Sequence, residues 1–160
     1  NYVDELSFFN NFLKYLTKKK LKKIYLKPHP SSHHRYYLDP TLDLLSKNKY
    51  IKIINKKENF KDVLKKNKLI ICTSYETTFN QSMLSGTPTI LLMNMKNFSM
   101  HPKVKKIFRE LVRAKIIFTE PNRASKHVNE IINDPLKWYN SKKIQNVRNN
   151  FLKTAFNLRT

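Results

Sequence analysis

The sequence predicts an α/β fold: a single Rossmann-like, doubly wound parallel sheet of about five strands with helices on both faces. Short apolar runs alternate with longer amphipathic stretches along the 160 residues, as in the strand–helix units of parallel sheets. The 40% hydrophobic content suffices for one packed core. Since no internal repeat or low-complexity linker divides the chain, we expect one domain over residues 1–160.

The five apolar runs predict strands at residues 24–26, 51–54, 69–72, 89–93 and 116–118. The amphipathic stretches predict helices at residues 4–19, 39–46, 59–65, 76–85, 102–114, 122–133 and 140–156. In the helix over 102–114 the spacing places one apolar face at Val104, Ile107, Phe108, Leu111 and Val112. We expect the strand order 2-1-3-4-5.

The chain has one glycine, where about 11 would be usual at about 7% usage. Glycine-rich phosphate loops and the G-x-S-x-G elbow each need at least two glycines and are excluded. A phosphate site here must therefore use other groups. Gly86 is expected to end the helix over 76–85, because glycine favours the left-handed conformation just past a helix.

The second compositional outlier is the net charge of +21. Such a charge suggests polyanionic partners, although a composition rich in Lys and Asn is an alternative explanation. The single cysteine, Cys72, excludes an internal disulfide and a multi-cysteine zinc site. No apolar run reaches the length of about 18 residues that a membrane helix needs, and we expect no secretory signal peptide in the residues given. Because the chain starts at Asn1 without Met, we expect a fragment.

Ligands of open parallel sheets bind beyond the carboxyl ends of the strands, where the strand order reverses. In the predicted order this point lies between strands one and three, which are followed by residues 27–30 and 73–78. A helix N-terminus alone can hold phosphate, and the hydroxyls of Ser74, Thr77 and Thr78 add donors. Ser74 could instead be only the N-cap of the helix, and the two roles can coexist.

His29 stands between Pro28 and Pro30, which stiffen the backbone. It could donate a hydrogen bond to a phosphate or act as a general acid. Lys27 alternates with His29 along an extended chain, so it could add charge to the same site or be a solvated lysine. The adjacent histidines at 33 and 34 lack a third ligand at suitable spacing, so we expect no metal site.

Residues 25–30 (YLKPHP) and 69–92 (LIICTSYETTFNQSMLSGTPTILL) resemble the C-terminal half of bacterial surface-polysaccharide glycosyltransferases of the GT-B fold. The K-P-H-P element is similar to that of capsule and lipopolysaccharide transferases that use CMP-activated 3-deoxy-manno-octulosonate or sialic-acid-like sugars. The C-terminal stretch resembles transferases encoded in bacterial surface-carbohydrate clusters, through Ala124, Val128, Asn129, Ile131, Trp138, Tyr139, Gln145 and Arg148.

The resemblance implies one lobe of a GT-B fold that binds a nucleotide-sugar donor. His29 would be the catalytic candidate and contact the donor phosphate, and Gln81 stands where many such enzymes place a ribose-binding Glu. The implied donor-binding residues are Lys27, His29, Ser74, Thr77, Thr78 and Gln81. No metal and no cofactor are implied, since the nucleotide-sugar is a substrate. The N-terminal lobe, which usually supplies the catalytic base, is expected to lie outside residues 1–160, so we expect these residues to bind donor without turnover.

The leading hypothesis is therefore a glycosyltransferase that moves a sugar, from a CMP-sugar by preference, to a surface polysaccharide or lipopolysaccharide. Its partners would be the donor, a glycan or lipid-linked acceptor and an anionic membrane surface. We expect it in the cytoplasm, peripheral at the inner face of the membrane. One alternative is transfer of glycerol- or ribitol-phosphate from a CDP donor. Another is a non-enzymatic basic module for nucleic acid, although no helix-turn-helix, RNP or zinc signature is present.

Overall fold

The computed structural model describes residues 2–17, 23–28, 48–55, 57–96 and 99–156. Its elements are α1 (Tyr2–Lys14), β1 (Tyr25–Leu26), β2 (Lys52–Ile53), α4 (Phe60–Lys66), β3 (Ile70–Cys72), α5 (Thr77–Ser85), β4 (Thr89–Leu92), α6 (Pro102–Arg113), β5 (Ile117–Phe118), α7 (Pro121–Ile131), α8 (Pro135–Tyr139) and α9 (Lys142–Phe156). Each predicted strand is found where it was expected. The helix predicted over 39–46 lies outside the described residues.

The strands form two small parallel sheets. β1 pairs with β2, with Leu26 opposite Ile53. β4 lies between β3 and β5, with Cys72 opposite Leu91. These neighbours agree with the order 2-1-3-4-5, but the described residues show no pairing of β1 with β3, so one five-stranded sheet is not shown. β1 and β2 are two residues long and Ile53 is 47% exposed, unlike the buried strands inside a parallel sheet.

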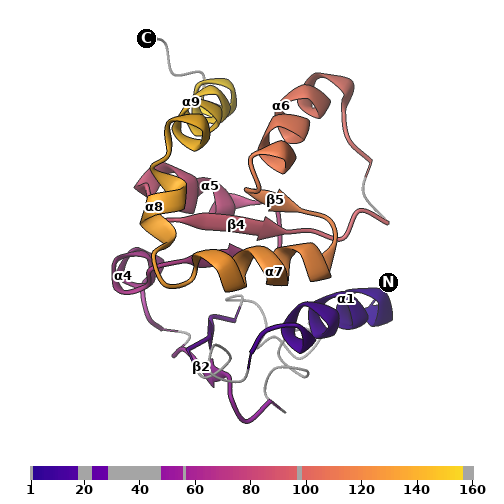
Figure 1. Cartoon of the computed structure of the whole chain (residues 1–160), viewed down its shortest axis with the longest axis vertical. Helices are drawn as coiled ribbons and strands as arrows, with labels where there is room; N and C mark the ends of the chain where they lie inside the picture. The colour runs from indigo at the N-terminus through magenta and orange to yellow at the C-terminus, as the bar shows by residue number, and fades with distance from the viewer. Residues whose placement is uncertain (1, 18–22, 29–47, 56, 97–98, 157–160) are drawn as a thin grey trace.

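Helices cover both faces of the three-stranded sheet, as a doubly wound fold requires (Figure 1). All four residues of β4 are buried, and alternate side chains point to opposite faces of a strand. Leu91 joins a core with residues of α5, α6 and α9 on one face. Ile90 and Leu92 join a second core with α1 and α7 on the other face.

Two side chains of α7 hold the C-terminal end of α1. The last carbonyl groups of a helix have no partner inside the helix. Ser125 Oγ lies 2.7 Å from the Phe12 carbonyl oxygen, and Asn129 Nδ2 donates to the Tyr15 carbonyl at 3.0 Å. Ser125 and Asn129 are four residues apart on one face of α7, so their spacing fixes where α1 lies.

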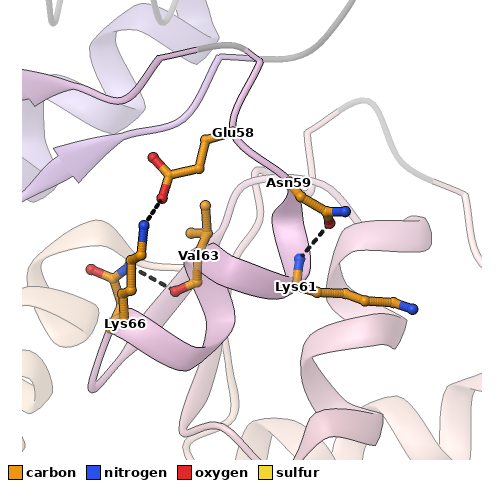
Figure 2. A network of polar contacts seen from close by, with 6 residues as sticks. Glu58, Asn59, Lys61, Val63 and Lys66 are labelled. Carbon is orange, nitrogen blue, oxygen red and sulfur yellow. Dashed lines mark hydrogen bonds and ion pairs between the residues drawn. The ribbon is translucent and has the colours of Figure 1, made fainter.

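The short helix α4 leads into β3 and is closed at both ends by polar side chains (Figure 2). Asn59 Oδ1 accepts from the Lys61 N–H at 3.0 Å, which is a typical N-cap. At the other end, Asn67 Nδ2 donates to the Val63 carbonyl oxygen at 2.7 Å. Lys66 Nζ also lies 2.7 Å from Oε1 of Glu58, which precedes the N-cap. This ion pair is the leading cause that raises the pKa of Lys66.

Two details of the C-terminal half correct the sequence-based expectation. Val104 and Val112 are each 36% exposed, because the side of α6 that packs on the core runs through Ile107, Phe108 and Leu111. The short helix α8 was not predicted. Asp134 Oδ1 accepts from the Lys137 N–H at 3.2 Å, and Pro135 follows the cap, a typical helix start.

Candidate functional site at the β3–α5 junction

The polar junction that follows the third strand lies at the carboxyl end of β3. Thr73 and Ser74 are exposed there. Tyr75 is half-buried, with its ring 5.5 Å from that of Phe79 and 6.4 Å from that of Phe151. Tyr75 thus anchors the loop on the core, and the residues on either side of it face solvent.

The first turn of α5 has no side-chain cap. Its N-cap residue is Glu76, in an extended conformation (φ −138°, ψ −161°), and no side chain accepts from the N–H groups of the turn. The alternative that made Ser74 the N-cap is therefore wrong, since the helix starts at Thr77, three residues later. The N-terminus of a helix carries a partial positive charge on such N–H groups, so this junction is suited to an anion.

Thr77, Thr78 and Gln81 are all exposed on α5. Residues three and four apart are neighbours on a helix surface, so Gln81 lies one turn beyond both threonines. The other side of α5 carries the buried Phe79 and Met83. Four of the six predicted donor-site residues therefore belong to one junction: Ser74, Thr77, Thr78 and Gln81.

The remaining two predicted residues belong to the segment after β1. Lys27 is partly exposed and precedes the buried Pro28. His29 lies outside the described residues, so its predicted role is neither confirmed nor contradicted. Whether the β1 and β3 junctions meet, as the predicted sheet order requires, is likewise a prediction that the described residues do not decide.

The ionisable groups around the junction favour binding over covalent chemistry. Burial raises the pKa of the Cys72 thiol to about 12, so it is a poor nucleophile. Burial also raises the pKa of Tyr75. Glu76 is the one carboxylate between residues 73 and 81, and it is exposed. No group of three or more His, Cys, Asp or Glu side chains suited to a metal occurs within the described ranges.

Two shallow hollows lie away from this junction. One of about 430 Å³ is lined by Tyr15, Asn122, Lys126, Asn129 and Glu130. Another of about 360 Å³ lies along α6. Neither includes a predicted donor-site residue.

Comparison with known families decides the class of the protein. The model of a family described as LIC12162 family transferase matches residues 2–159. The chain belongs to this family. No curated protein and no solved structure matches the chain. The family description supports the predicted transferase class and names neither the group transferred nor its acceptor.

In this LIC12162 family transferase, the C-terminal residues that carried the resemblance are mostly packing residues. Ala124, Val128 and Tyr139 are buried. Arg148 lies over the Tyr139 ring, with its guanidinium carbon 3.8 Å from the ring centroid. Gln145 is exposed. Tyr139 Oη lies 3.3 Å from Met83 Sδ of α5, so part of this C-terminal set packs against the buried side of that helix.

One notable residue of the LIC12162 family chain had no role in the sequence-based prediction. His127 is 4% exposed and lies against the rings of Phe118 and Trp138. The centroid of its ring is 5.4 Å from that of Phe118 and 4.9 Å from that of Trp138. Neither ring nitrogen has a hydrogen-bond partner, and Nδ1 lies 3.7 Å from Glu130 Oε2. Its position on the apolar face of the 122–133 pattern, one residue before Val128, is the signal that could have found it.

Across the described helices, none combines the length and apolarity needed to cross a bilayer.

Proposed function

We propose that this LIC12162 family transferase takes a sugar from a nucleotide-activated donor, a CMP-sugar by preference, and transfers it to a surface polysaccharide or lipopolysaccharide. The observation that carries the proposal is the uncapped first turn of α5 with exposed hydroxyls beside it. The resemblance of residues 25–30 and 69–92 to GT-B glycosyltransferases supports the choice of sugar as the transferred group.

In this proposal the donor phosphate binds at the N-terminus of α5. The N–H groups of the first turn and the hydroxyls of Ser74, Thr77 and Thr78 donate to its oxygens, which is how a helix N-terminus holds phosphate without glycines. Gln81, one turn further along, hydrogen-bonds the ribose hydroxyls through its amide. An amide does this without charge, so the bond is weaker than the one a carboxylate forms.

Departure of the nucleotide leaves negative charge on its phosphate. We propose that the positive end of α5 stabilises this charge together with Lys27 and His29, and that His29 donates a hydrogen bond or a proton there. Donors aimed at the developing charge are the usual way in which enzymes stabilise such a leaving group. The scheme requires no bound metal ion and no cofactor.

Calorimetric titration of the chain with CMP tests the phosphate site. Thr77→Val and Thr78→Val remove hydroxyls and keep the branched side-chain shape. Each hydrogen bond to a charged group contributes about 1.5–3 kcal/mol, so we expect the double variant to bind CMP at least tenfold more weakly. Thr154→Val on α9, whose hydroxyl is also exposed, is the matched control and should bind CMP like the parent chain. Equal CMP affinity in the double variant and the control would contradict the proposal.

Competition among donors tests the proposed substrate. A CMP-sugar should displace CMP more effectively than UDP-sugars or CDP-glycerol. The same phosphate site also suits a CDP-glycerol or CDP-ribitol donor, so tighter binding of those compounds would replace sugar transfer by transfer of a polyol phosphate. Binding of none of the nucleotides would reject the donor site itself.

A further inference from the structure

The outer face of α6 is strongly basic. Five of its twelve residues are Lys or Arg and one is acidic. Lys105, Lys106, Arg109 and Arg113 are exposed. With Pro102 and Glu110 they line the shallow hollow of about 360 Å³. Residues 105, 109 and 113 are four apart, so their side chains follow one stripe along the helix.

The charges of this stripe are not neutralised by neighbouring carboxylates. Across the described ranges, ion pairs within 4.0 Å between Lys or Arg and acidic side chains lie on other elements: Lys66–Glu58, Lys96–Asp4, Lys115–Glu130 and Arg123–Glu120. The half-buried Glu110 is the one acidic residue of α6, and it forms no such pair with the exposed cations. Like charges held this close repel one another unless a polyanion binds them.

The opposite side of α6 is already occupied. Ile107, Phe108 and Leu111 pack in the core that the helix shares with β5 and α9. A free amphipathic helix inserts its apolar face among lipid chains, but α6 cannot do so without leaving the core. Any surface that α6 contacts must therefore be bound through charge.

We propose that the outer face of α6 binds the surface of an anionic lipid bilayer by electrostatic attraction. Twelve helical residues extend over about 18 Å, and Figure 1 shows α6 together with α9 at the end of the molecule opposite to β2. A bilayer fits better than single-stranded RNA, because the exposed residues of α6 include no aromatic ring on which bases could stack. The inference does not depend on which group the enzyme transfers.

Co-sedimentation of the chain with lipid vesicles tests this inference. Vesicles of phosphatidylcholine mixed with phosphatidylglycerol should bind the chain, and pure phosphatidylcholine vesicles should not. The test variant combines Lys105→Gln, Lys106→Gln, Arg109→Gln and Arg113→Gln. The matched control removes the same number of charges elsewhere, with Lys52→Gln, Lys57→Gln, Lys61→Gln and Lys65→Gln, all exposed residues.

Each basic residue near an anionic surface contributes about fivefold to the affinity. We expect the α6 variant to bind anionic vesicles at least tenfold more weakly than the control variant, and binding of the parent chain to fall as salt is raised. Equal loss in both variants would show that only total charge matters and would overturn the proposal. Equal binding of the parent chain to neutral and anionic vesicles would also overturn it. So would binding to an RNA oligonucleotide that is tighter than binding to vesicles and is abolished by the α6 substitutions.

Discussion

At the scale of single residues, the buried hydroxyl of Ser125 joins the first helix to the rest of the domain. Its oxygen lies 2.7 Å from the carbonyl oxygens of both Phe12 and Pro121, and a hydroxyl has one proton to donate. Ser125 is 0% exposed, so water cannot replace it if it is lost. The Phe12 carbonyl at the end of α1 therefore depends on this side chain.

We expect Ser125→Ala to lower the free energy of unfolding by about 1–3 kcal/mol, because it leaves a buried carbonyl group without a donor. Urea denaturation followed by circular dichroism measures the change. Thr154→Ala is the control, since Thr154 donates to the Asn150 carbonyl at 2.9 Å on an exposed part of α9. The idea fails if both variants lose the same stability.

His127 makes the stability depend on pH. Burial lowers its pKa, helped by the charge of Lys115 and opposed by that of Glu130. The unfolded chain therefore binds a proton at a higher pH than the folded chain does. The stabilising contribution of neutral His127 to the free energy of unfolding is fully present above its unfolded pKa of about 6.5. This contribution is lost as the pH falls below that value, by at most about 1.4 kcal/mol per pH unit.

Replacement by phenylalanine tests the source of this pH dependence. We expect His127→Phe to reduce the loss of unfolding free energy between neutral pH and about pH 5.5, measured by urea denaturation. An unchanged slope in His127→Phe would assign the titration to other groups.

At the scale of elements, the helix α5 depends on special residues at both ends. It starts without a side-chain cap and ends at Gly86, whose φ of 75° lies in the left-handed region. Gly86 N–H bonds the Met83 carbonyl at 3.4 Å. The prediction that Gly86 ends this helix is confirmed, so the single glycine of the chain stands at a left-handed position; Lys115 (φ 60°) is the other one among the described residues.

We expect Gly86→Ala to destabilise the fold by about 1–2 kcal/mol, the cost of placing an alanine in the left-handed conformation. A Cβ atom here would lie 3.8 Å from Arg148 Nη2, an ordinary contact, so the loss comes from the backbone and not from a clash. Thermal unfolding measures it. Gly86→Asn should lose less, because Asn tolerates this conformation better. An alanine variant as stable as the parent would contradict this explanation.

The elements were predictable where local pattern decides them. Strands such as Ile70–Cys72 and Thr89–Leu92 are short apolar runs, and the start signal of α4 and the end signal of α5 lie at the first residue outside each helix. The short helix α8 was missed although Asp134 and Pro135 mark its start. Val104 and Val112 were assigned to the apolar face of α6, because residue spacing alone does not show on which residues the buried side of a helix is centred.

At the scale of the whole molecule, long-range pairing limits what the sequence can predict. The neighbours β3, β4 and β5 were predicted correctly, because each is linked to the next by a single helix. Whether β1 lies beside β3 depends on contacts between distant segments, and so does the predicted meeting of Lys27 and His29 with the α5 junction. The residues after β3 could be grouped from sequence because they lie within one loop and the first turns of the helix that follows it.

The central claim is that the β3–α5 junction binds the phosphate of a nucleotide-activated donor. Titration of the isotope-labelled chain with CMP, followed through the backbone amide signals, tests it most directly. We expect the largest shifts at Ser74, Thr77 and Thr78, with smaller shifts at Gln81 and His29 and none along α6. No shift at the junction with CMP, UDP or their sugars, or shifts confined to α6, would contradict it.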